Sequence, residues 1–122
     1  MNIQEPCSDR RRFAREDVHV PVRYEIKASK QFGATLTKDI SEGGIKMTLE
    51  RFLPLHTEVK LNINLEEIAT LVHALGSIAW LRQIPYSDRY QLGIKFLEMD
   101  ENYKKSLREY LRRRRLKAAF SL

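Results

Sequence analysis

Hydrophobic residues alternate with polar residues in six short stretches of this chain, and a stretch with a helical period follows them. The alternation is clearest at residues 18–28, where valine, tyrosine and isoleucine take every second position. Strict alternation is typical of a strand that is buried on one face. Pro21 lacks an N–H and falls on the polar face, which indicates an edge position or a bulge. The predicted strands cover residues 18–28, 32–40, 44–50, 58–65, 70–82 and 89–98.

Two of these stretches carry more specific expectations. Within residues 32–40, Phe32, Ala34 and Leu36 share one phase, and we expect them to face the core. The stretch 70–82 is long and apolar on both faces, which is typical of a central strand. We expect Gly76 to mark a bend or a bulge in it.

The hydrophobic period changes after residue 99. Asp100 is a predicted N-cap, and Glu101 follows in the first turn, where the helix dipole favours a negative charge. One apolar helical stripe is formed by Tyr103, Leu107, Tyr110 and Leu111. Strands with short connections and no helical crossovers predict an antiparallel sheet, which closes into a barrel or packs as a small sandwich. The terminal helix is expected to cover an end or a flank of it.

Composition argues against several classes of function. The 122 residues suit one domain, and a single cysteine, Cys7, cannot form an internal disulfide. We therefore expect a cytoplasmic protein, without a metal site because the three histidines are scattered. Ser41 has no histidine nearby in sequence and no P-loop is present, so we expect no enzyme. The most apolar stretch, residues 68–81, is shorter than the ~20 residues of a membrane span, and no signal peptide precedes it.

The net charge of +6 is concentrated in two places. Residues 104–117 hold eight Lys or Arg and one Glu. The plain interpretation of this run is a solvated helix end, whose charge complements the helix dipole. The alternative function is a docking adaptor that binds an acidic protein or, less favoured, nucleic acid through this helix and without a nucleotide. A second cluster of arginines lies within residues 10–15, ahead of the first strand.

A second short stretch, residues 38–46, combines groups that suit a nucleotide. Asp39 and Ser41 are separated by one residue, so their side chains are expected to leave the same face. Gly43 and Gly44 permit a tight turn with positive φ and close approach of a ligand. A carboxylate complements the N–H edge of guanine, whereas the planar fork of arginine suits phosphate and the O6/N7 edge. The two stretches together predict a site for a guanine nucleotide, although Asp39 and Ser41 also suit a plain turn.

Two motifs of this chain resemble those of the PilZ domain. The first is a pair of arginines, separated by three residues, before the first strand. The second is D-x-S-x-x-G after the second strand. The motifs read R-R-F-A-R at residues 11–15 and D-I-S-E-G-G at residues 39–44, and "SIAWLRQ" and "YQLGIKF" are similar to the late-strand pattern of that family. The resemblance implies a six-stranded antiparallel β-barrel with a C-terminal α-helix. It divides the chain into an arm at 1–17, a barrel at 18–99 and a helix at 100–122. It also implies binding of cyclic di-GMP, a bacterial second messenger.

The resemblance implies roles for individual residues. Arg11 and Arg15 are expected to contact guanine edges and phosphates, Asp39 to accept from guanine N–H groups, and Ser41 to bond a phosphate or base. Arg10 precedes the motif, and an arginine there goes with a stacked pair of ligand molecules, so one or two nucleotides per chain are expected. The implied contact residues are Arg10, Arg11, Arg15, Asp39, Ser41 and Gly44, with Arg12, Gly43 and Trp80 as secondary candidates. For Trp80 a place in the core is favoured over a ligand contact.

The arginines at 10–15 are expected to form a moving arm. Four close cations repel one another, so we expect disorder without ligand and closure over the barrel with it. Ordering costs roughly 1–2 kcal/mol per residue, and charge-assisted hydrogen bonds of about 1.5–3 kcal/mol each must offset that cost. The surface changed by closure would be read by a downstream protein partner.

Overall fold

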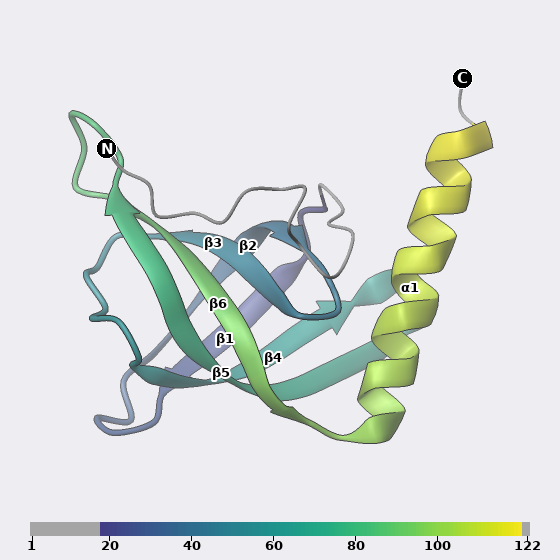
Figure 1. Cartoon of the computed structure of the whole chain (residues 1–122), viewed down its shortest axis with the longest axis horizontal. Helices are drawn as coiled ribbons and strands as arrows, with labels where there is room; N and C mark the ends of the chain where they lie inside the picture. Colours follow the sequence, from purple (N-terminus) through teal and green to yellow (C-terminus); the bar gives the residue numbers. More distant parts are fainter. Residues whose placement is uncertain (1–17, 121–122) are drawn as a thin grey trace.

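The computed structural model describes residues 18–120 and shows a closed antiparallel barrel followed by one long helix (Figure 1). The strands are β1 (Pro21–Ile26), β2 (Phe32–Ile40), β3 (Gly44–Leu49), β4 (Glu58–Leu65), β5 (Thr70–Gln83) and β6 (Tyr90–Met99). A short 3₁₀ helix, η2 (Glu66–Ile68), joins β4 to β5, and α1 spans Glu101–Phe120. The predicted succession of six strands and one helix is confirmed, and the open choice between barrel and sandwich is settled in favour of the barrel.

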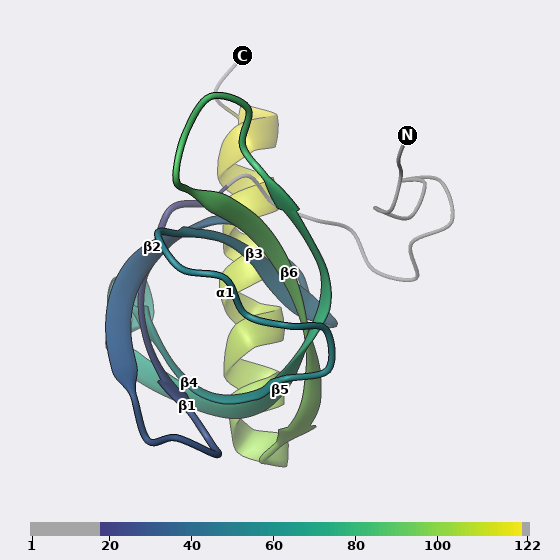
Figure 2. The same cartoon turned by 90° about the vertical axis from the view of Figure 1, so that its left-hand side faces the viewer.

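Around the barrel the strands follow the order β1-β2-β3-β6-β5-β4, so β3 and β4 lie on opposite sides. Figure 2 shows the strands as a ring, and α1 crosses one open end of it. Within the described residues no helix combines the length and hydrophobicity that crossing a membrane requires.

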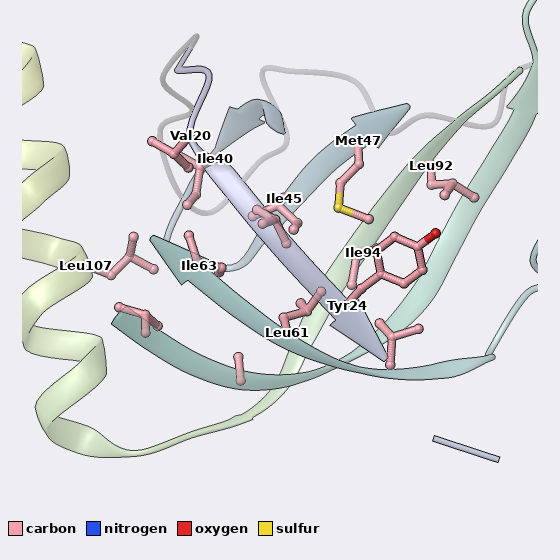
Figure 3. Packing of buried hydrophobic residues seen from close by; sticks show 14 of the residues in the cluster. Val20, Tyr24, Ile40, Ile45, Met47, Leu61, Ile63, Leu92, Ile94 and Leu107 are labelled. Atoms are coloured by element: carbon pink, nitrogen blue, oxygen red, sulfur yellow. The ribbon is translucent and has the colours of Figure 1, made fainter. Parts of the chain in front are cut away.

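One continuous hydrophobic core fills the barrel (Figure 3). Its largest fully buried barrel side chains are Ile40, Ile45, Met47, Leu61, Ile63, Leu65, Ile78 and Leu92. Leu107, Tyr110 and Leu111 of α1 are buried as well, and Leu107 points into the barrel end beside Ile63 (Figure 3). The apolar stripe predicted for the helix therefore closes the barrel.

The helix begins where the sequence predicts. The backbone N–H of Asn102 donates to Asp100 Oδ1 at 2.8 Å. The N–H of Lys104 donates to the carbonyl of Asp100 at 3.0 Å. Asp100 is thus the N-cap, and its carboxylate also lies at the positive end of the helix dipole.

Before its bulge, strand β2 turns Phe32, Ala34 and Leu36 away from the core, contrary to the prediction. Phe32 is 77% exposed and Leu36 is 54% exposed, whereas Thr37 and Ile40 are fully buried. Pairing with β3 shifts register between Thr37 and Asp39, which leaves Lys38 as an extra residue. A bulge of one residue exchanges the two faces of a strand. Residues of β2 still alternate in sequence. Before the bulge, however, the apolar positions lie outside the barrel and the polar positions lie inside.

Strand β5 is irregular at two points of its pairing with β6. The register shifts beside Gly76, where the irregularity was predicted, and again between Ile78 and Trp80. At the second point Ala79 is the extra residue of β5, and Trp80 then pairs with Gly93. Leu92 and Ile94, on either side of Gly93, are buried, so Gly93 faces outward. Its partner Trp80 therefore also lies on the outside of the barrel wall.

Candidate functional site

Four residues form a row across the outer surface of the barrel, which we call the outer row. Asp39 of β2 pairs with Lys46 of β3, Lys46 pairs with Gly93 of β6, and Gly93 pairs with Trp80 of β5. The bulge of β2 brings Asp39 onto this face, and the bulge of β5 brings Trp80 onto it. Two irregularities on separate strands thus place a carboxylate and an indole on the same side of the barrel.

Lys46 lies between the carboxylate and the indole. Its Nζ is 3.5 Å from Asp39 Oδ2, and the two side chains are only 19% and 15% exposed. The same ammonium lies over the Trp80 ring, 5.9 Å from the ring centroid, which is within the range of a cation–π interaction. Trp80 is 8% exposed.

Gly93 makes room for the indole. A Cβ on Gly93 would lie 2.0 Å from Trp80 Nε1, so a larger residue here would displace the ring. Trp80 packs on this bare backbone and does not belong to the central hydrophobic cluster. Trp80 is therefore a buried residue of the outer wall.

Ser41 closes the β2–β3 hairpin. Its N–H donates to the carbonyl of Gly44 at 2.9 Å, and its hydroxyl accepts from the N–H of Gly43 at 3.2 Å. Ser41 is buried. Its hydroxyl therefore has a structural role in the turn.

Gly44 of the hairpin serves close packing, and neither Gly43 nor Gly44 forms a left-handed turn. No described glycine has a positive φ, so the conformation expected for Gly43 and Gly44 is wrong. The reason is visible at Gly44, where a Cβ would lie 2.2 Å from the backbone oxygen of Ile94. Gly44 allows β3 to approach β6, and the bonds of Ser41 close the turn.

The hairpin is also tied to β6 and to α1. The N–H of Phe96 donates to the carbonyl of Gly43 at 2.9 Å. Glu42 accepts a hydrogen bond from Arg108 Nε of α1 at 3.1 Å, within an ion pair. A pocket of about 380 Å³ lies between the hairpin, the end of β6 and the first turns of α1, and Glu42, Phe96, Leu107 and Arg108 line it.

Thr37 holds the start of the described chain against β2. Its hydroxyl accepts from the N–H of Val20 at 3.0 Å and donates to the carbonyl of Val18. Its own N–H donates to the carbonyl of Val20 at 3.0 Å. The segment that follows the arginine cluster is thus fixed two positions before Asp39. Sequence reasoning did not find Thr37, since these partners are 17 and 19 residues apart.

The basic run of α1 is partly neutralised within the molecule. Glu109 accepts hydrogen bonds from Arg112 and Arg113, which lower the pKa of its carboxyl from the usual 4.5 to about 2. Glu67, in η2, forms ion pairs with Arg114 and Lys117 at 2.9 and 3.3 Å. Several cations of the run therefore hold α1 together or attach it to the barrel, which weakens the nucleic-acid interpretation.

The predicted contact residues fall into two groups. Asp39 and Trp80 lie in the outer row, and Ser41, Gly43 and Gly44 form the neighbouring hairpin. The arginines of the cluster, Arg10, Arg11, Arg12 and Arg15, lie outside the described residues. Among residues 18–118 no group of three metal-binding side chains gathers.

Comparison with known proteins gives a family and a fold. The family described as "PilZ domain" matches residues 9–113. No curated protein matches the sequence. Among solved structures, Bacillus subtilis inhibitor of motility (MotI/DgrA) superposes with a TM-score of 0.75 at 24% identity, over 88% of this chain and 52% of that one.

Two further structures share the fold and contain cyclic di-GMP. The PilZ domain of YcgR from Escherichia coli has a TM-score of 0.66 at 18% identity, and 91% of this chain and 98% of that chain are covered. The K. pneumonia MrkH complex has a TM-score of 0.70 at 19% identity, over 90% and 54% of the two chains. This chain therefore spans about half the length of the MotI and MrkH chains.

Proposed function

The chain belongs to the PilZ domain family, and from this membership and the geometry of the outer row we propose that it is a receptor for cyclic di-GMP. The observation that carries the proposal is the outward carboxylate of Asp39, two residues after Thr37, to which Val20 is bonded. A carboxylate there can accept from the N–H edge of a guanine. The proposal assigns the protein a binding role without catalysis, in the bacterial cytoplasm.

The arginine cluster supplies the complementary charge in this proposal. Arg15 precedes Val18 by three residues, which span at most roughly 10 Å when extended. Because Val18 is bonded to Thr37, two residues before Asp39, the length of the chain allows Arg15 to reach the neighbourhood of Asp39. Arg11 and Arg15 then bind phosphates and the O6/N7 edge of guanine through their planar forks.

The remaining residues of the site have distinct proposed roles. Trp80 offers a stacking face for a base, and each such contact is worth about 1–3 kcal/mol in single-stranded nucleic acid complexes. Ser41 and Gly44 shape the hairpin beside the ligand. Arg10 and Arg12 provide charge for a second, stacked nucleotide, so the binding ratio is one or two per chain.

Closure of the arm over the outer row is the proposed response to the ligand. Ordering the arm costs roughly 1–2 kcal/mol per residue, whereas each charge-assisted hydrogen bond returns about 1.5–3 kcal/mol. Several such bonds are needed, and the two phosphates of the ligand provide their acceptors. The arm therefore closes only when nucleotide is present.

The output of the receptor is proposed to pass through α1. The hairpin beside the ligand is joined to α1 by the ion pair of Glu42 and Arg108. A shift of the hairpin would change the surface between the two elements, where the 380 Å³ pocket lies. We infer that a downstream protein reads this surface.

Calorimetric titration of cyclic di-GMP tests the proposal. We expect the wild type to bind and Arg11→Ala/Arg15→Ala to lose at least about 100-fold in affinity, because two charge-assisted bonds are removed. Arg113→Ala/Arg115→Ala removes the same charge from α1 and should leave the affinity unchanged. No heat with the wild type would reject the receptor function. Equal loss in both variants would reject the arm as the binding element and favour the basic helix.

A further inference from the structure

Lys46 lies at the point where the two groups proposed to hold a guanine meet. Its ammonium is 3.5 Å from the carboxylate of Asp39 and 5.9 Å from the centroid of the Trp80 ring. Neither the arginine motif nor D-x-S-x-x-G includes this position. Because Lys46 lies between the carboxylate and the indole, it is a candidate for direct contact with the ligand.

The contact between Lys46 and Asp39 is loose. Charge-assisted N–H···O bonds are usually about 2.7–2.9 Å long, and this one is 3.5 Å. The lysine side chain is flexible, and its ammonium is a compact charge with rotatable donors. With only 19% of the side chain exposed, the ammonium needs a nearby negative group or ring to offset its partial loss of solvent. It is therefore held in place but can exchange one anionic partner for another.

A guanine needs the same partners that Lys46 uses. Its N–H edge requires the oxygens of Asp39, and its ring requires a face of Trp80. One side of the indole packs on the backbone of Gly93, where a Cβ would approach Nε1 to 2.0 Å. A base must therefore stack from the side on which the ammonium lies. A base can therefore enter only if the ammonium of Lys46 moves.

We propose that Lys46 is a ligand-contact residue, which passes its ammonium from Asp39 to a phosphate of cyclic di-GMP when a guanine takes the carboxylate. This inference rests on the proposed function. The exchange keeps every charge paired, because the guanine edge replaces the ammonium at Asp39 and the phosphate replaces the carboxylate at Lys46. It also makes the outer row sensitive to the presence of both a base and a phosphate.

The test compares substitutions at two outward-facing lysines. Lys46→Met removes the charge and keeps the length of the side chain, and Lys46→Arg restores the charge. Lys60→Met is the matched control, because exposed Lys60 lies on β4, opposite β3 across the barrel. Affinity for cyclic di-GMP is measured by calorimetry at low and at high salt. Thermal unfolding of each variant is measured alongside, and Lys46→Gln serves as a second neutral variant.

We expect Lys46→Met and Lys46→Gln to weaken binding about tenfold at low salt and less at high salt, because salt screens the lost attraction. Lys46→Arg should stay within about threefold of the wild type, and Lys60→Met should not differ from it. Trp80 is the only tryptophan, so its emission reports on the site and should change during the titration of the wild type. The change should occur at higher ligand concentration in Lys46→Met.

The outcomes separate the two proposals. Wild-type binding together with unchanged or tighter binding by both neutral variants would overturn the role of Lys46 and leave the receptor function intact. A wild type that binds no cyclic di-GMP would reject the receptor function itself. A loss of affinity that has the same size at both salt concentrations would also overturn the phosphate contact, since a structural effect does not depend on screening.

Discussion

The hydroxyl of Thr37 accepts a hydrogen bond from the N–H of Val20 at 3.0 Å, and this bond fixes the first described segment to the strand that carries Asp39. The same hydroxyl donates to the carbonyl of Val18. Thr37 is fully buried. One side chain therefore bonds both Val18 and Val20 to the strand that carries Asp39 of the outer row.

Thr37→Val should lower both stability and nucleotide affinity. Valine keeps the shape of threonine but leaves the N–H of Val20 without this partner, at a cost of about 1–3 kcal/mol in the free energy of unfolding. Cyclic di-GMP should bind more weakly, because the start of the arm is less well held. Urea denaturation and calorimetry measure the two effects. Thr35→Val removes a hydroxyl bonded to the carbonyl of Thr48 at 3.0 Å and is the control, expected to keep the affinity.

Ile40→Ala and Phe32→Ala should differ sharply in their effect on stability. Ile40 is fully buried, so its truncation should cost about 2–5 kcal/mol. Phe32 is mostly exposed, and its truncation should change the free energy of unfolding by no more than about 0.5 kcal/mol. Denaturant unfolding of the two variants decides the matter. Similar costs would place Phe32 in the core and contradict the bulge at Lys38.

Gly44→Ala should destabilise the protein in the absence of nucleotide. A Cβ at this position would lie 2.2 Å from the backbone oxygen of Ile94, and backbone cannot move aside as a flexible side chain can. The expected loss is about 1–3 kcal/mol, which is typical of overpacking. Thermal or chemical unfolding of the ligand-free variant measures it. Unchanged stability with weakened nucleotide binding would instead give Gly44 a role in ligand contact alone.

The middle turns of α1 should lose stability in acid. Hydrogen bonds from Arg112 and Arg113 lower the pKa of Glu109 from 4.5 to about 2. Because the folded pKa is depressed, the stabilisation is complete above the ordinary value and is lost as the pH falls toward 2. Titration of the Glu109 side chain by NMR at low salt measures this pKa directly. Glu109→Gln should remove this contribution, whereas a midpoint near the ordinary value would show that the arginines do not hold the carboxylate.

Alternation and capping predict most of the architecture. Strands β1, β3 and β4 bury the residues that alternation selects, and the helix begins at the predicted cap, Asp100. These features are local, so neighbouring residues determine them. The bulges at Lys38 and Ala79 are different, because an extra residue at these positions has no pattern of its own. The face of β2 was misassigned for this reason.

The candidate site depends on the features that local patterns miss. Asp39 was found from its motif, but its outward position follows from the bulge at Lys38. Lys46 was not found, because its relation to Trp80 arises from the register of three strands. Ser41 and Gly44 were found as motif residues, and the structure gives both a role in forming the hairpin.

Glu42 occupies a position that D-x-S-x-x-G leaves unspecified, and its partner Arg108 lies 66 residues further along the chain. The residue that connects the hairpin to the helix is therefore not one of the residues proposed to contact the nucleotide. If the chain acts as proposed, a substitution at Glu42 should change how the helix responds and leave ligand specificity the same. The proposed function thus predicts that sensing and output can be separated by mutations within residues 39–44.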